Sequence, residues 1–232
     1  IDGEAEYDRS GSSVALSSDG SVVAIGAPGN GHNGNLDHSS GHVRIYQNIG
    51  GNWDLIGSDI DGEAAGDRSG SSVALSSDGS IVAIGARGND GNGEVSGHVR
   101  IYQNIGGYWD QIGSDIDGEA GDFSGHLVAL SSDGSVVAIG GYWDQIRIYQ
   151  NIGGNWDLIG SDINGEAAGD NALYSVSLSS DGSVVAIGAE RNDGNGSNSG
   201  HVRIYKNIGG NWDQIGSDID GEAANDYFGS SV

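Results

Sequence analysis

The sequence predicts an all-β protein, a β-propeller built of four-stranded antiparallel blades. Three observations predict it: a unit of about 56 residues is present four times, short apolar segments alternate with glycine-containing turns, and no apolar stripe has a helical period. A four-stranded sheet cannot cover its own apolar faces, but sheets stacked around an axis cover each other. A parallel β-solenoid is the alternative, although its coils are usually shorter and lack hairpin turns.

Three phrases recur in the same order and define the repeat. The first, Ser-Ser-Asp-Gly-Ser, places its aspartate at positions 19, 78, 133 and 181. Arg-Ile-Tyr then begins at positions 44, 100, 147 and 203, and Trp-Asp begins at positions 53, 109, 156 and 212. We assign blades to residues 13–68, 69–123, 124–171 and 172–228. Residues 1–12 are then the end of a preceding repeat and 229–232 the start of a further one, so we expect a segment of a longer array.

Each unit is expected to contain four short strands. In the first unit, Ser13–Ser17 has apolar residues at period two, and Val22–Ala27 is a continuous apolar run typical of a strand buried on both faces. The turn between them contains Gly20, which can adopt a positive φ. His42–Asn48 and Trp53–Ile60 complete the sheet. Whether four units close a ring or remain an open array is left undecided by the sequence.

The third unit departs from the others before its third strand. Residues 140–146 copy residues 106–112 and replace the loop found elsewhere. Because the apolar residue expected at the start of the strand is still supplied by Ile146, we expect the blade to survive this exchange.

Composition excludes several functional classes. The formal net charge is −24, with 33 acidic and 9 basic side chains, so nucleic acid is not an expected partner. The chain has no cysteine, which excludes a disulfide scaffold, a thiol nucleophile and a cysteine zinc site. No apolar run approaches the roughly 18 residues that a membrane-spanning helix needs, so membrane insertion is not expected.

Two short motifs carry a family resemblance. Phe228-Gly229-Ser230-Ser231-Val232 and Gly26-Ala27-Pro28, spaced as they are along the repeat, resemble the FG-GAP repeat of integrin α-type propellers. The resemblance implies an extracellular or cell-surface propeller that serves adhesion, ligand binding or assembly. Many FG-GAP blades carry a calcium loop between their first two strands. Here residues 17–21 fill that place with a single carboxylate, so that calcium site is not carried over.

Carboxylates are densest in the links between blades, which we consider as candidate calcium loops. Alternating acidic residues followed by glycine offer the oxygen ligands that Ca²⁺ prefers. The alternative is a solvated turn whose acids accept backbone hydrogen bonds and pair with arginines of a neighbouring blade. The candidate metal ligands are Asp59, Asp61, Glu63 and Asp67, then Asp115, Asp117, Glu119 and Asp122, and finally Asp218, Asp220, Glu222 and Asp226.

Aromatic residues supply a second candidate site. Tyr108, Tyr142 and Trp143 are the residues best placed to stack on a sugar ring. The recurring tryptophans, which include Trp109, are instead expected to pack between blades. Trp143 lies outside the repeat pattern, so that packing explanation does not apply to it.

The sequence therefore predicts an extracellular binding module. No Gly-x-Ser-x-Gly or His-Glu-x-x-His motif is present, and the recurring histidines are spread by symmetry, so we predict that the chain is not an enzyme. The expected function is protein binding, adhesion or structural assembly at a surface, matrix or filament, with self-assembly included. A carbohydrate-binding propeller and an accessory domain of a larger secreted enzyme are the alternatives. Calcium is the one cofactor that the sequence suggests.

Overall fold

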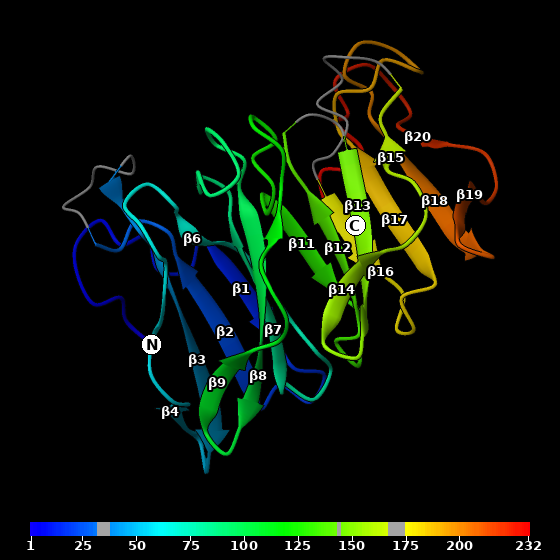
Figure 1. The fold of residues 1–232 in the computed structure, drawn as a ribbon. Helices are drawn as coiled ribbons and strands as arrows, with labels where there is room; N and C mark the ends of the chain where they lie inside the picture. Colours follow the sequence, from blue (N-terminus) through cyan, green and yellow to red (C-terminus); the bar gives the residue numbers. More distant parts are fainter. Residues whose placement is uncertain (32–37, 143–144, 167–174) are drawn as a thin grey trace.

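The computed structural model confirms the all-β prediction. It describes residues 1–31, 38–142, 145–166 and 175–232, and the regular elements in these ranges are all strands. Four antiparallel sheets follow one another along the chain and lie side by side (Figure 1). Each is a propeller blade of the predicted kind. A membrane-crossing helix, judged by length and apolar character, is not found in the described part of the chain.

Blade 1 shows how the repeat folds. Its strands β1 (Ser13–Leu16), β2 (Val22–Ala27), β3 (His42–Ile49) and β4 (Asn52–Leu55) lie in this order across the sheet. The two-residue strand β5 (Ile60–Asp61) also pairs with β3, at its first two residues. The fourth strand is thus interrupted rather than continuous from residue 53 to 60 as expected. The reason is Gly57, whose φ of 74° is incompatible with an extended strand.

Blades 2, 3 and 4 repeat this arrangement. Blade 2 contains β6 (Ser69–Leu75), β7 (Ile81–Ala86), β8 (His98–Ile105), β9 (Tyr108–Gln111) and β10 (Ile116–Asp117). Blade 3 contains β11 (Leu127–Leu130), β12 (Val136–Gly140), β13 (Gln145–Ile152), β14 (Asn155–Leu158) and β15 (Ile163–Asn164). Blade 4 contains β16 (Ser175–Leu178), β17 (Val184–Ala189), β18 (His201–Ile208), β19 (Asn211–Gln214) and β20 (Ile219–Asp220).

The recurring aspartate closes the first hairpin of each blade. In blade 1, Oδ1 of Asp19 accepts hydrogen bonds from the Ser21 amide at 2.9 Å and the Ser17 hydroxyl at 2.8 Å. These bonds, those from Ser21 first, lower the pKa of Asp19 to about 2. Gly20 adopts the expected positive φ of 71°. The most regular acidic residue of the repeat therefore has a structural role in the turn.

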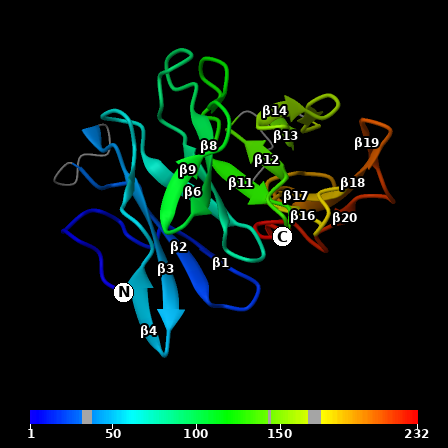
Figure 2. The ribbon, with the colours of Figure 1, turned by 60° about the horizontal axis from the view of Figure 1, so that its bottom comes forward.

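The core lies between consecutive blades. Val43, Ile45 and Ile60 of blade 1 pack against Val82 and Ile84 of blade 2, and all five are buried. Equivalent clusters join blade 2 to blade 3 and blade 3 to blade 4. The inner strands contact one another in sequence, β1 with β6, β6 with β11, and β11 with β16, and Figure 2 shows the sheets fanned around this row. Stacking of the repeats thus supplies the burial that a single blade lacks.

The inner strands approach so closely that glycine is required where they meet. A Cβ atom on Gly26 would lie 2.1 Å from the carbonyl oxygen of Gly70 in the next blade. At the following junction, a Cβ on Gly85 would lie 2.0 Å from the carbonyl oxygen of Gly125. Since no real side chain tolerates such a distance, these glycines set the spacing of the blades.

The recurring tryptophans join the outer parts of the blades, as their packing interpretation predicts. The indole Nε1 of Trp109 donates a hydrogen bond of 3.0 Å to the carbonyl oxygen of Ile56 in the preceding blade. Trp156 and Trp212 make the equivalent bonds at 2.9 Å. The indole hydrogen bond therefore ties blades 2, 3 and 4 to their predecessors at the edge of an apolar interface.

The four blades form an open arc. The first blade leaves Val14 54% exposed, whereas its counterpart Val73 in blade 2 is 6% exposed. At the other end Ile219 is 48% exposed, whereas its counterpart Ile60 is 9% exposed. None of the extensive contacts between described strands joins blade 4 to blade 1. The inter-blade interface is therefore formed three times and left half-formed at both ends.

Candidate functional site: a groove between blades and two kinds of polar cluster

A groove of about 350 Å³ lies at the junction of blades 1 and 2. One wall comes from the link between β4 and β6, and the other from β8 and the start of β9. Its volume falls in the range of small-molecule sites. The lining residues are Ser58, Asp59, Ile60, Asp61, Tyr102, Tyr108, Trp109 and Asp110.

The groove combines aromatic rings with carboxylates. Tyr108 is 74% exposed, and the hydrogen bond from Trp109 to Ile56 of blade 1 fixes the indole in the wall of the groove. Asp59 is held by Arg44, whose Nε and Nη2 atoms lie 2.9 and 3.0 Å from its two carboxylate oxygens. Two sets of residues predicted separately, Tyr108 and the pair Asp59 and Asp61, thus line one groove. Aromatic faces and hydrogen-bond acceptors are the groups that hold a sugar ring.

This groove is distinct among the three junctions. The repeat position of Tyr108 is occupied by asparagine in the other blades, at Asn52, Asn155 and Asn211. The tryptophan that follows is the same in all four. Tyr108 therefore adds a side chain that the fold of the blade does not require.

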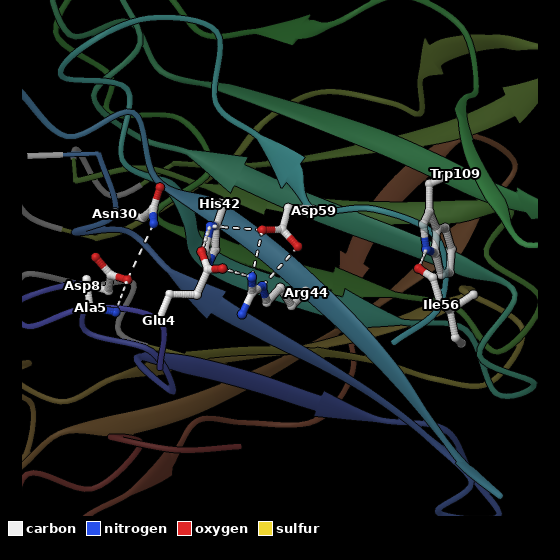
Figure 3. Close-up of polar contacts among 9 residues, drawn as sticks. All are labelled: Glu4, Ala5, Asp8, Asn30, His42, Arg44, Ile56, Asp59 and Trp109. Carbon is white, nitrogen blue, oxygen red and sulfur yellow. Dashed lines mark hydrogen bonds and ion pairs between the residues drawn. The ribbon is translucent and has the colours of Figure 1, made fainter. Parts of the chain in front are cut away.

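The predicted calcium loops are divided between different partners. Figure 3 shows the arrangement in blade 1, where Glu4 and Asp59 meet around His42 and Arg44. Glu4 comes from the segment before the blade and Asp59 from its end. The same pattern brings Glu63 from the first predicted loop and Asp115 from the second loop to His98 and Arg100, and Glu166 and Asp218 to His201 and Arg203.

The remaining carboxylates of these loops have separate partners, and Glu119 and Asp122 pair with Arg147 of blade 3. The side chain of Asp67 accepts a hydrogen bond of 2.9 Å from the Ala64 amide and closes a turn. Asp122 and Asp226 do the same with the amides of Glu119 and Ala223. The acidic residues Asp61, Asp117 and Asp220 belong to the two-residue strands, and Glu222 is exposed. Calcium binding by these loops stays a prediction.

The histidines of these clusters were noted in the sequence as recurring residues spread by symmetry, but they were not among the predicted ligands. In each of the three, one histidine nitrogen and two carboxylate oxygens lie within 4.8 Å of one another, so they could hold a metal ion. An arginine already neutralises the carboxylates in every case. The clusters therefore tie a blade to the segment preceding it. The spacing His-x-Arg with an aspartate 15 residues after the arginine is the signal that could have found them.

The surroundings of the blade 4 cluster disfavour protonation of its histidine. Hydrogen bonding to Arg203 lowers the pKa of Asp218 to about 2. Burial, and then the charge of Arg203, lowers the pKa of His201. Among the described residues, the buried Nδ1 atom of His201 has no hydrogen-bond partner, and it lies beside a cavity of about 10 Å³, which is room for one water molecule.

A third feature surrounds Tyr142, another residue predicted to bind a ligand. Its ring centroid lies 4.7 Å from that of Phe123 and 4.5 Å from that of His126. The Cζ atom of Arg87 lies 5.6 Å from the same ring, and its Nη1 donates to the Tyr142 hydroxyl. We call these four residues the Arg87 cluster. Trp143 lies outside the described residues.

Comparisons with known proteins identify the fold. No protein-family model and no curated protein sequence matches the chain. Among solved structures, Kuenenia stuttgartiensis hydrazine synthase matches 95% of the chain with a TM-score of 0.59 and 13% identity. A Bacteroides uniformis protein described as a putative 6-phosphogluconolactonase matches 90% of the chain with a TM-score of 0.51 and 11% identity, over 71% of its own length. The chain spans about half (51%) of the matched hydrazine synthase chain.

These neighbours correct one prediction. The chain was predicted not to be an enzyme, but these two solved structures are both described as enzymes. A propeller of this form is therefore compatible with catalysis, and the lack of familiar catalytic motifs does not exclude it. At this identity the likeness shows the fold alone. The FG-GAP resemblance stays a prediction, and the chain is established as a β-propeller-like array of four blades.

Proposed function

We propose that the chain is an extracellular binding module whose groove between blades 1 and 2 holds a neutral carbohydrate. The observation that carries the proposal is the groove itself, of about 350 Å³, with Tyr108, Trp109 and Tyr102 beside Asp59, Asp61 and Asp110. The high acidity of the chain suits an extracellular protein, since a net charge of −24 opposes non-specific association.

The chemistry of the lining favours a neutral sugar over a charged one. The apolar face of a sugar ring stacks on an exposed aromatic side chain such as Tyr108. The carboxylates accept hydrogen bonds from sugar hydroxyls, as Asp61 and Asp110 are placed to do. The same carboxylates repel an acidic sugar.

The substitution Tyr108→Asn tests this function. It introduces the residue that the other three blades carry at this position, so the fold should be retained. We expect neutral oligosaccharides on a glycan array to bind the wild-type chain. Calorimetry with the oligosaccharide that binds most tightly should show that Tyr108→Asn lowers the affinity at least about tenfold. Asn155→Ala, at the same position in blade 3, is the matched control and should bind normally. Binding to no neutral glycan, or equal binding by Tyr108→Asn, would refute the carbohydrate function.

Structural assembly is the second candidate function, and a separate observation favours it. The apolar faces of blade 1 at Val14 and Leu16 and of blade 4 at Ile219 are exposed where their counterparts inside the array are covered by a neighbouring blade. Trp53 likewise lacks the preceding blade whose carbonyl its counterpart Trp109 bonds. The partner that fits these faces is another blade of the same repeat.

A further inference from the structure

The Arg87 cluster consists of residues at positions where the repeats differ. The position of Arg87, directly after the second strand, is occupied by Pro28, Tyr142 and Glu190 in the other blades. Phe123 stands where blades 1 and 2 are preceded by Arg9 and Arg68, and His126 stands where they have Ser12 and Ser71. Residues that a blade needs for folding recur in this chain. The four residues of the Arg87 cluster do not recur at their repeat positions, yet they contact one another, so the folding of a blade does not explain them.

Blades 2 and 3 bring the cluster together. Arg87 follows β7 of blade 2, Phe123 and His126 precede β11, and Tyr142 follows β12 of blade 3. The Tyr142 amide donates a hydrogen bond of 3.0 Å to the carbonyl oxygen of Asp122, which fixes the tyrosine beside the segment that carries Phe123. Tyr142 remains 45% exposed, so part of its surface is open to a ligand.

The charge of Arg87 is not neutralised within the described residues. Arg44, Arg100, Arg147 and Arg203 each form ion pairs with at least two carboxylates. The described contacts of Arg87 are instead the Tyr142 hydroxyl and His126 Nδ1, at 3.2 Å from its Nη1, and its buried Nε has no hydrogen-bond partner. Among the described residues, this guanidinium therefore has no carboxylate partner and retains one unused N–H donor.

His126 adds a donor but no charge at neutral pH. Burial, and then the charge of Arg87, lowers its pKa to about 4. Because arginine has only donors, the Nδ1 atom of His126 is the acceptor of their hydrogen bond, and its proton is therefore on Nε2. The cluster presents one positive charge, N–H donors and aromatic faces.

We propose that the Arg87 cluster is a second binding site, specific for a carboxylate-bearing sugar such as a uronic acid. The sugar carboxylate would pair with Arg87, a geometry that guanidinium groups favour, and the ring would lie against Tyr142. This site goes beyond the groove at Tyr108, because its charge selects the acidic sugars that the groove repels. The two sites lie at different junctions and can be tested separately.

Titration with sodium glucuronate, with glucose as the uncharged match, tests the proposal. At pH 7 and about 150 mM salt, where long-range repulsion is screened, we expect saturable binding of glucuronate, about tenfold tighter than any binding of glucose. Nuclear magnetic resonance should show the His126 ring signals shifting during the titration. No saturable binding of glucuronate, or equal binding of glucose, would overturn the proposal.

Variants that carry residues of the other repeats identify the side chains responsible. Arg87→Glu introduces the residue of blade 4 and should abolish glucuronate binding, and His126→Ser introduces the residue of blade 2 and should weaken it at least threefold. Arg87→Gln removes the charge alone and settles the question if Arg87→Glu does not fold. Arg191→Glu, at an exposed arginine outside the cluster, is the control and should bind normally. Full binding by a folded Arg87→Gln would also overturn the proposal, whereas Tyr108→Asn should leave glucuronate binding unchanged.

Discussion

At the scale of single residues, recurrence separates structural from functional side chains. Asp19, which recurs in every blade, closes a turn, and Trp109, which also recurs, joins blade 2 to blade 1. Tyr108 and Arg87 occupy positions at which the other blades carry different residues. Recurrence is visible in the sequence, but the contacts that give each residue its role are between blades, and they become visible only in the structure.

The protonation of His126 predicts part of the acid sensitivity of the chain. Its folded-state pKa of about 4 lies below the ordinary 6.5, so the unfolded chain takes up a proton first as the pH falls. The stability that His126 contributes is therefore complete above about pH 6.5 and is lost as the pH falls toward 4. We expect urea unfolding to show that the free energy of unfolding falls between pH 7.5 and 5 in both proteins. The fall should be smaller in His126→Gln than in the wild type, by up to about 2 kcal/mol. An identical loss in both proteins would contradict this account.

At the scale of secondary-structure elements, the strands and their turns follow from local sequence. The period-two pattern, the apolar run of β2 and the glycine turns predict β1, β2 and β3 to within about a residue or two. The interruption between β4 and β5 was not predicted, because Gly57 follows an apolar segment that reads as a continuous strand. Gly57 lies at the junction with blade 2, where a Cβ atom would lie 2.8 Å from the carbonyl oxygen of Gly107.

The spacing of the inner strands makes Gly85 sensitive to substitution. A Cβ at this position would lie 2.0 Å from the Gly125 carbonyl oxygen, so Gly85→Ala must push blades 2 and 3 apart. We expect a loss of about 3 kcal/mol in the free energy of unfolding, measured by urea denaturation. Gly106→Asn is the control. Asparagine can adopt the positive φ of this position, and a Cβ atom placed there would have no atom within 4 Å apart from its chain neighbours. A loss of the same size in both variants would show that blade spacing is not the cause.

At the scale of the whole molecule, stacking of the blades both builds the core and leaves two faces uncovered. At each of the three complete junctions, an apolar face of one blade packs against the blade that follows it in the chain. The faces at Leu16 and Ile219 are the two halves of such a junction. They are complementary to each other because the repeats are nearly identical, which is the property of a head-to-tail interface.

Association through these faces can be tested with the 232-residue chain. We expect light scattering to show concentration-dependent association of the wild type, and Leu16→Glu and Ile219→Glu each to reduce it by burying a charge in the interface. A mixture of the two variants retains one intact pair of faces and should form dimers that neither variant forms alone. Ile105→Glu, at an exposed hairpin tip, is the control. Association that persists in both end-face variants would refute this mode of assembly.

The sequence by itself determined the blade: its strands, its hairpin turns and the number of repeats, because these depend on local pattern and on glycine conformation. Only the tertiary structure decided which residues meet between blades. Glu63 and Asp115, predicted in separate loops, converge on His98, and Arg87, Phe123, His126 and Tyr142 converge across 55 residues of chain. These contacts depend on how one sheet stacks on the next, and stacking is set by close approach of glycines and by shared burial, which no single segment encodes.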